Sequence, residues 1–551
     1  MFVREKTING HTYLYLVESV REGGRTKQRI IKNLGRKDAV LASGELDRLA
    51  ASVARFAERA IVLAKVASGN PDGLSCRRLG PPLLFGRLWT DTGIAAVLEE
   101  LLAPRAFGFA VERAVFIATL HRLMVSGSDR ACERWMADYA ILGSAGLALH
   151  HVYRAMAWLG EELPAGAQAD ATPFAPRAVK DLVEERLFAR RRDLFTELSV
   201  VFLDTTTLAF AGRGGERLGR RGHSKDHRPD LMQMVLGVVV DAEGRPVCTE
   251  MWPGNTADVT VLVPIVDRLR ARFAIDRVCV VADRGMISAA TIAALEARRL
   301  EYVLGVRERS DALVQRMVLA DDRPFVPLLV PRANGQETDL AAKEVVAGGS
   351  RYIVCRNEAE AAKDAADRQA VLAALARQLR KGDKALVGNS AYRRFLKTTG
   401  RRFVIDQDKA AFEARFDGIF ILRTNARISP LQAMLRYREL LVVEQLFRTA
   451  KALMRTRPIY HSSDAAIRGH VFCSFLALVL RKELEDRCRA AGFRPEWGDV
   501  LRDLDRLQEV ELTKDGKHLV LRTPVSGVAG KLFQAARIAL PPNVREPAPA
   551  P

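Results

Sequence analysis

The feature that most constrains the fold is the order of strand and helix patterns between residues 198 and 307. Three segments rich in branched apolar residues come first: LSVVFLDTTTLAF, LMQMVLGVVVD and RPVCTEMWPG. A helical pattern over 256–273 follows, and after it come the apolar segment RVCVVADRGM, the helical segment SAATIAALEARR and the strand pattern EYVLGVRER. Helical crossovers between strands are typical of an α/β sheet, and this order predicts that the first and fourth strands lie side by side.

Two aspartates, Asp204 and Asp283, stand where the first and fourth strands are predicted to end. The carboxyl ends of neighbouring parallel strands meet at one edge of a sheet, so the two carboxylates are expected to come together. A single aspartate at a strand end is more often only a cap. The pair, in this strand order, predicts an α/β fold with a ribonuclease H-like core.

A third acidic residue lies on a long helix that is predicted to begin at Ser429 and to end at Pro458. Tyr437, Glu444 and Lys451 are spaced seven apart and share one side of this helix. Taken alone, the pattern indicates a core helix with a solvated basic side. With the two aspartates, Glu444 completes a carboxylate set that suits two hard divalent cations about 3.5–4 Å apart, a pair that activates a water or a 3′-hydroxyl in phosphodiester chemistry.

The remaining patterns divide the chain into regions. A β-hairpin is predicted from Thr12 to Leu34 and a helix from Gly44 to Lys65, with a linker around 70–80 and a buried helix after His461. The regions are 1–75 (hairpin and helix), 81–195 (helical domain), 196–307 with 416–480 (ribonuclease H-like core), 308–415 (mixed insertion before the last catalytic helix), 481–540 (C-terminal region) and 541–551 (disordered tail).

Charge and cysteine usage narrow the class of protein. Lys plus Arg number 85 against 66 Asp plus Glu, a net charge of +19, which favours a polyanionic partner such as nucleic acid. The seven cysteines are scattered without zinc-site spacing and are interpreted as reduced thiols. The sequence shows neither a signal peptide nor an apolar run of membrane-spanning length, so a cytoplasmic protein is expected.

Several motifs carry a family resemblance: LDTTTLAF, GHSKDHRPDLMQ, PGNTADVT, VVADRGMIS and YRELLVVEQLFRTAKALMRTRPIYH, in this order. With the N-terminal segment TYLYLVESVREGGRTKQRIIKNLG, they resemble the DDE transposases of the IS4 superfamily, most closely the IS1634 group. The resemblance implies that Asp204, Asp283 and Glu444 are the catalytic, metal-binding triad, with Mg²⁺ as cofactor and Mn²⁺ as its substitute. It also implies double-stranded DNA as partner, both inverted-repeat ends and target, a homodimer in the synaptic complex, and DNA-end binding by the N-terminal and helical regions.

The family signature on the last helix, Y-x2-R-x3-E-x6-K, is matched at Tyr437, Glu444 and Lys451, but Leu440 replaces its arginine. By resemblance, Tyr437 and Lys451 contact phosphates near the cleaved end, and either Arg438 or Arg448 takes the place of the missing arginine. Basic residues placed near the two aspartates add further candidate DNA contacts: Lys225, His227, Arg228 and Arg284. Residues 308–415 contain no tryptophan, so the base-flipping role that some relatives give to such a residue is not transferred.

Two other functions remain open from the sequence. A nuclease on the same scaffold would hydrolyse DNA without joining strands. A decayed transposase would only bind DNA, in a salt-sensitive manner.

Overall fold

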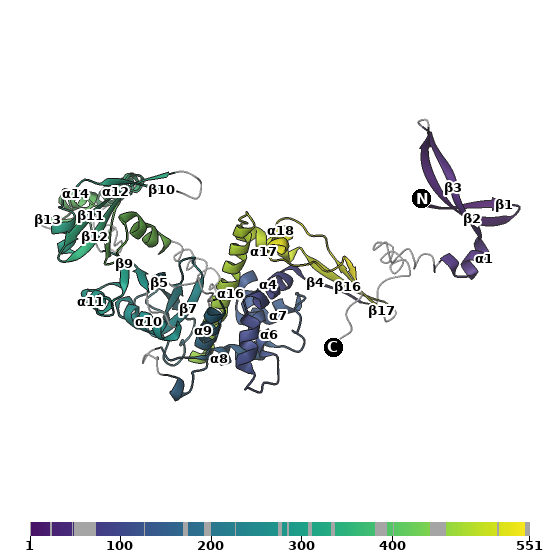
Figure 1. Ribbon diagram of the computed structural model, residues 1–551, viewed down its shortest axis with the longest axis horizontal. Helices are drawn as coiled ribbons and strands as arrows, with labels where there is room; N and C mark the ends of the chain where they lie inside the picture. The colour runs from purple at the N-terminus through teal and green to yellow at the C-terminus, as the bar shows by residue number, and fades with distance from the viewer. Residues whose placement is uncertain are drawn as a thin grey trace. The chain divides into compact units, whose positions relative to one another are not determined.

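The computed structural model describes residues 2–22, 25–46, 48, 73–125, 127–168, 175–191, 200–225, 228–273, 278–283, 286–306, 311–331, 337–380, 394–399, 402–440, 459–514 and 517–545 (Figure 1). The chain divides into two compact units, of which the first contains residues 1–80, 138–140 and 496–551 and the second residues 81–137 and 141–495. Among the described residues, no helix combines the length and hydropathy required to cross a membrane.

The first unit begins with an antiparallel sheet of β1 (Phe2–Ile8), β2 (His11–Glu22) and β3 (Arg25–Arg36), followed by α1 (Lys37–Ala42). The predicted hairpin is therefore confirmed. Strand β1 was not predicted, and it joins β2 through Asn9 and Gly10, which both have positive φ (49° and 78°), the geometry of a tight hairpin turn. Most of the helix predicted from Gly44 to Lys65 lies outside the described residues.

A second sheet of this unit corrects the predicted linker around 70–80. Strand β4 (Gly73–Arg78) pairs with β16 (Gln508–Lys514), which pairs with β17 (Lys517–Arg522), and α17 (Trp497–Asp505) and α18 (Ala529–Ala535) accompany them. The Cys76 thiol donates to Gln508 Oε1 (3.1 Å) across a separation of 432 positions. The linker prediction was wrong because β4 lacks apolar alternation, and backbone pairing with a remote strand makes it a strand.

The predicted disordered tail, 541–551, also differs in part. Residues Val544–Arg545 form β18, which pairs with β17, and Arg545 lies 3.0 Å from the carboxylate of Glu509. The strand partner again comes from a distant segment. Residues 546–551 lie outside the described residues.

The second unit contains the predicted helical region. Its helices are α4 (Gly80–Asp91), α5 (Ile94–Leu102), α6 (Val111–Met124), α7 (Asp129–Ala137), α8 (Leu149–Leu159) and α9 (Val179–Arg191). The buried helix expected after His461 is α16 (Asp464–Ala490), and it packs on α6 and α8 (Figure 1). At this crossing a Cβ on Gly469 would lie 1.8 Å from the carbonyl oxygen of Met156, so only glycine allows the approach.

The main sheet of the second unit has nine strands within the described residues, in the order β10-β11-β12-β15-β9-β8-β5-β6-β7. Its first part comprises β5 (Val200–Ala209), β6 (Gln233–Val240), β7 (Pro246–Pro253), α10 (Asp258–Phe273), β8 (Cys279–Ala282), α11 (Ala289–Ala297) and β9 (Glu301–Gly305). Strands β5, β8 and β9 run parallel, β6 is antiparallel to β5, and β7, which is antiparallel to β6, runs in the direction of β5 again. The first and fourth strands therefore lie side by side, as predicted.

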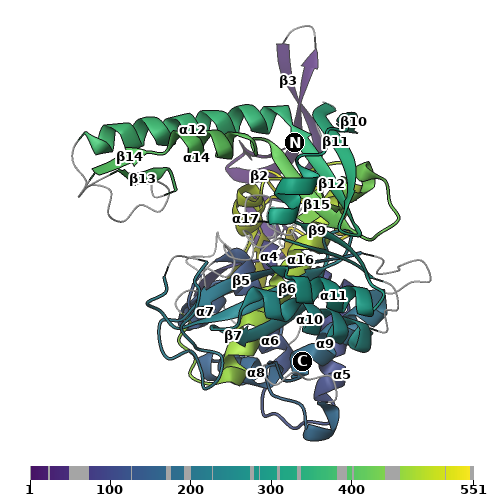
Figure 2. The same cartoon turned by 90° about the vertical axis from the view of Figure 1, so that its left-hand side faces the viewer.

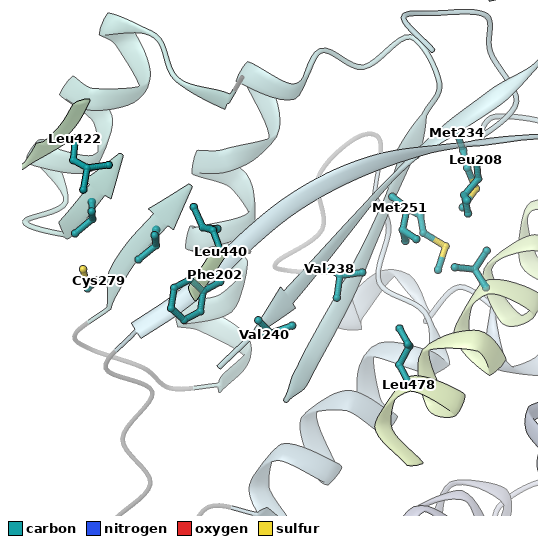
Figure 3. Close-up of a cluster of buried hydrophobic side chains, with 14 of the residues drawn as sticks. Phe202, Leu208, Met234, Val238, Val240, Met251, Cys279, Leu422, Leu440 and Leu478 are labelled. Atoms are coloured by element: carbon teal, nitrogen blue, oxygen red, sulfur yellow. The ribbon is translucent and has the colours of Figure 1, made fainter. Parts of the chain in front are cut away.

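Helices cover both faces of this mixed α/β sheet. Along β5, Val201 and Leu203 join a core with α10 and α11, whereas Phe202 joins the opposite core with the helix of residues 430–440 and α16. Figure 3 shows the second core, in which Leu440 lies with Phe202. The strand is thus buried on both sides, which agrees with its continuous apolar pattern.

The mixed insertion extends the same sheet. It contains β10 (Val326–Pro331), β11 (Glu337–Ala347), β12 (Ser350–Asn357), α12 (Glu358–Leu379), β13 (Leu396–Thr399), β14 (Arg402–Ile405) and α14 (Gln407–Ala414), and β15 (Ile419–Thr424) follows it. Strand β15 pairs with β9 on one side and with β12 on the other, so a continuous hydrogen-bonded ladder joins the insertion to the rest. Figure 2 shows α12 with the β13–β14 hairpin beside it, where Leu375 and Phe395 form a small core.

A buried cluster of charges fastens α9 to α10 and β7. Its cations and carboxylates are Arg177, Lys180, Arg268 and Arg272 against Asp181, Glu184, Glu185 and Glu250. The Arg272 side chain has no exposed surface, and its Nη2 lies 2.6 Å from Glu184 Oε2. Burial opposes the charge on Arg272, but the surrounding carboxylates hold its pKa well above the ordinary value.

Candidate active site

Asp204 and Asp283 occupy equivalent positions on neighbouring parallel strands. The pairing of β5 with β8 ends at Leu203 and Ala282, so the next residue along each strand is an aspartate. Neighbouring strands lie about 4.8 Å apart, which brings the two backbones within reach of one shared site.

The two aspartates differ in one respect from the sequence prediction. Asp283 is the first residue after β8, as predicted, and it is exposed. Asp204, in contrast, lies inside β5, opposite Val238 of β6. The strand does not end at Asp204 because β6 continues to pair with β5 as far as Ala209, after the ladder with β8 has stopped.

The helix that was predicted to carry the third carboxylate reaches Asp283 through Tyr437. The helix begins as expected: Ser429 Oγ accepts the N–H of Gln432 (3.1 Å), and Gln432 Oε1 accepts the N–H of Ser429 (3.0 Å), a reciprocal cap. Eight residues on from Ser429, the Tyr437 hydroxyl donates to Asp283 Oδ1 (3.1 Å). A tyrosine that the resemblance assigns to phosphate contact thus holds one of the aspartates.

The Tyr437 ring has a fixed place on the sheet. It stacks nearly parallel to Phe420 of β15, with ring centroids 6.5 Å apart and an interplanar angle of 16°. On β9, a Cβ at Gly305 would lie 2.3 Å from the tyrosine oxygen, so Gly305 leaves the space that the hydroxyl occupies. The hydrogen bond to Asp283 is therefore supported from two neighbouring strands.

Leu440, at the arginine position of the family signature, belongs to the apolar core. Its side chain is 8% exposed and lies in the cluster that contains Phe202, Cys279 and Leu422 (Figure 3). A charged group there would lose its hydration, which explains why the chain carries leucine. Of the two arginines expected to replace the missing one, Arg438 is exposed and Arg448 lies outside the described residues.

Lys225 has internal partners beside Asp204. Its Nζ donates to the carbonyl oxygen (2.7 Å) and Oγ1 (2.8 Å) of Thr205, the residue after Asp204, and lies 3.0 Å from Asp258 Oδ2. The Thr205 hydroxyl in turn donates to Asp258 Oδ1 (2.9 Å). These bonds use the three ammonium hydrogens, so Lys225 braces the strand next to Asp204. The DNA contact predicted for Lys225 stays a prediction.

Asp258 also belongs to the group of residues beside Asp204, and it was not identified from the sequence. It is the first residue of α10 and belongs to the motif PGNTADVT, in which the sequence analysis singled out no carboxylate. The sequence feature that could have identified Asp258 is its place as an acidic residue in the first turn of a helix. Such a residue usually indicates only a favourable interaction with the helix dipole.

Arg228, another predicted DNA contact, forms a two-pronged ion pair with Asp230 at 2.8 and 2.7 Å. Hydrogen bonding to Arg228 lowers the pKa of Asp230. The pair is exposed, so a phosphate can compete for the guanidinium. The other predicted site residues lie outside the described residues: His227, Arg284, Glu444, Arg448 and Lys451.

The described part of the site suits divalent cations. Asp283 presents an exposed carboxylate, a hard oxygen ligand of the kind that such cations prefer, and the residue at the equivalent position of the neighbouring strand is a second aspartate. The Tyr437 hydroxyl donates to Oδ1 of Asp283, so this hydrogen bond does not use the other carboxylate oxygen, Oδ2.

Comparison with known proteins identifies the class. A family model described as "Transposase DDE domain" matches residues 196–480, more than half of the chain, which includes both aspartates and the helix of Tyr437. The protein therefore belongs to the DDE transposases, which are metal-dependent enzymes. A second model, "IS1634 family transposase, N-terminal domain", matches residues 3–67, and the protein is accordingly a DDE transposase of the IS1634 group, as the motifs predicted.

Comparison with solved structures finds the piggyBac transposase synaptic complex with hairpin DNA. The similarity covers 77% of this chain and 79% of that chain, with 12% sequence identity and a TM-score of 0.37. Comparison with curated proteins gives no match. The assignment rests on the two family models.

Proposed function

We propose that this transposase cuts the phosphodiester bonds at the inverted-repeat ends of its own insertion sequence and joins the freed 3′-hydroxyls to target DNA. The observation that carries the proposal is the pairing of β5 with β8, which gives Asp204 and Asp283 equivalent positions at one edge of the sheet. The strand order β9-β8-β5-β6-β7, in which only β6 runs opposite to the other four strands, supports a ribonuclease H-like core.

The proposed metal ligands are Asp204, Asp283 and Glu444, with Mg²⁺ as the cofactor and Mn²⁺ as its substitute. Bound divalent cations would lower the pKa of an attacking water or 3′-hydroxyl and stabilise the leaving oxygen. The chain's own contribution is orientation. Tyr437 holds one oxygen of Asp283, and the Lys225–Thr205–Asp258 bonds fix the strand beside Asp204.

The partner that we propose is double-stranded DNA, as inverted-repeat end and as target, in the cytoplasm. The net charge of +19 supports a polyanionic partner. The piggyBac complex in the comparison is a synaptic complex with hairpin DNA, and synapsis of two ends in this protein would take at least a homodimer. We propose that the N-terminal sheet and the helical region bind the DNA ends. The residues that we propose to contact phosphates are Tyr437, Lys451, Arg448, Lys225, His227, Arg228 and Arg284.

Strand cleavage and strand transfer by carboxylate variants test this function. Asp204→Asn, Asp283→Asn and Glu444→Gln are each expected to lose both activities with Mg²⁺ present, because each removes a charged oxygen ligand. Asp230→Asn serves as the matched control, since Asp230 is exposed and, among the described residues, forms its ion pair with Arg228. Wild-type cleavage by any triad variant would refute the assignment.

A pre-cut 3′ end separates the proposed function from its rivals. A transposase inserts this end into target DNA, whereas a nuclease of the same fold hydrolyses DNA and inserts nothing. Salt-sensitive binding without metal-dependent cutting would indicate a decayed, DNA-binding protein.

A further inference from the structure

A buried polar cluster of the second unit is separate from Asp204 and Asp283, and the family resemblance assigns no role to its residues. His461 precedes α16, His470 lies in α16, and Asp129 is the first residue of α7. Asp129 Oδ2 lies 3.0 Å from His461 Nε2 and 2.9 Å from His470 Nδ1, and the two nitrogens are 3.3 Å apart. Three ligand-type atoms from three segments thus converge on one point.

Hydrogen bonding alone does not satisfy this geometry. His470 Nδ1 lies 2.9 Å from Asp129 Oδ2, an acceptor, and also 2.9 Å from Arg122 Nη2, which can only donate. If Nδ1 carries a hydrogen, it opposes the guanidinium. If it does not, its lone pair opposes the carboxylate. The second ring nitrogen, Nε2, is buried and has no hydrogen-bond partner among the described residues.

We propose that Asp129, His461 and His470 bind one divalent transition-metal ion, separate from the catalytic cations. Two imidazole nitrogens and one carboxylate oxygen are a ligand set that Zn²⁺ accepts, whereas Mg²⁺ prefers oxygen ligands throughout. Tetrahedral Zn²⁺ with bonds of about 2.0–2.1 Å separates its ligand atoms by about 3.3 Å. The three atoms are already within a few tenths of an ångström of that spacing.

The surroundings resemble those of a structural metal site. Asp129 and His470 are buried, with 7% and 2% of their surface exposed, and Arg122 Nη2 donates to the other carboxylate oxygen of Asp129 at 2.7 Å. Such a bond orients a ligating carboxylate. Tyr153 places its ring edge-on to His461, with centroids 5.4 Å apart, and restricts that imidazole.

The site would fasten the end of the catalytic helix. Pro458, where the sequence predicts that this helix ends, is three residues before His461. A metal ion held by His461, α7 and α16 would therefore anchor the segment that follows Glu444 to the helical part of the unit. The proposed metal ion has a structural role, so this proposal does not depend on whether the protein carries out strand transfer.

Zinc binding by the full-length protein tests the site. After chelator treatment, the wild type in excess Mg²⁺ is expected to bind one Zn²⁺ per chain, measured by elemental analysis and by competition with a colorimetric zinc indicator. Asp129→Asn and His461→Phe should weaken that binding at least tenfold, since each removes a direct ligand. His150→Ala, which changes an exposed histidine of α8, should bind as the wild type does.

Two further measurements separate the zinc site from the catalytic site and from any effect of the substitutions on folding. Asp283→Asn should retain the zinc, which separates this site from the catalytic one. Co²⁺ added to the wild type should give the visible absorption of a tetrahedral nitrogen–oxygen site, a readout that needs no variant to fold. If the wild type binds no zinc, or binds it equally after His461→Phe, the cluster is an ion pair around Arg122 without a metal and the proposal is wrong.

Discussion

Replacing Arg272 with methionine tests how the helical region is held to the sheet. Methionine keeps much of the apolar stem but removes a guanidinium that lies within 3.2 Å of Asp181, Glu184 and Glu250 and has no exposed surface. Removing one partner of a buried ion pair costs about 3–5 kcal/mol. Lys180 and Arg268 remain nearby and offset part of the excess negative charge, so we expect a loss of about 4 kcal/mol in the free energy of unfolding at neutral pH.

The loss should depend on pH with a definite sign. Burial opposes the ionisation of Asp181, but Lys180 and Arg272 lower its pKa, so its ion pairs stabilise the fold above the unfolded pKa and lose that effect as the pH falls through the folded one. Without Arg272 the carboxylates take up protons at higher pH. The difference between wild type and variant should therefore be largest at neutral pH and shrink in acid.

Urea unfolding followed by circular dichroism measures both effects. Arg298→Met is the matched control, because Arg298 pairs with Asp267 at the surface, where the two side chains are 34% and 45% exposed. Exposed pairs contribute less than about 1 kcal/mol. If Arg272→Met costs no more than this control, or if its cost does not fall in acid, the buried cluster does not hold the two regions together.

Two other substitutions test the packing around the site. Tyr437→Phe keeps the ring on Gly305 and removes the hydrogen bond to Asp283, so the Mg²⁺ concentration for half-maximal cleavage should rise about tenfold, as for the loss of a group that orients a metal ligand; an unchanged Mg²⁺ titration would contradict the role of the hydroxyl. Gly469→Ala forces a methyl group to within 1.8 Å of the Met156 carbonyl and should cost at least about 1–3 kcal/mol in urea unfolding. Gly498→Ala, which meets nothing within 4 Å, should be neutral, and equal stability of the two alanine variants would show that α8 and α16 separate readily.

The strand order and the pair of aspartates were predictable because they depend on local patterns. The apolar runs before Asp204 and Asp283 and the helical segments between them determine which strands can be neighbours, and the pairing of Leu203 and Ala282 confirms that order. The N-cap at Ser429 was likewise predictable, because the preference for serine at this position is local. The return bond from the N–H of Ser429 to Gln432 was not predicted.

Other contacts were not predictable from local patterns. Lys225 was predicted to contact DNA because it lies in a basic loop, and no local pattern predicted that the fold brings Asp258 and Thr205 against it. The pairing of β4 with β16 and the convergence of Asp129 with His470 join segments hundreds of residues apart, and no sequence spacing records such contacts. Leu440 shows a different case. The family signature has an arginine at this position, but here the side chain is buried in the apolar core, where leucine fits.

The pairing of β4 with β16 has a consequence for synthesis on the ribosome. Strand β4 pairs with β16 in the described sheet, although the two strands are far apart in the chain, with 432 positions between Cys76 and Gln508. During elongation, the backbone groups of β4 that pair with β16 therefore wait in the nascent chain until β16 has been translated. A product that terminates before β16 would expose this strand edge and invite self-association, so the sheet closes only after β16 has been made.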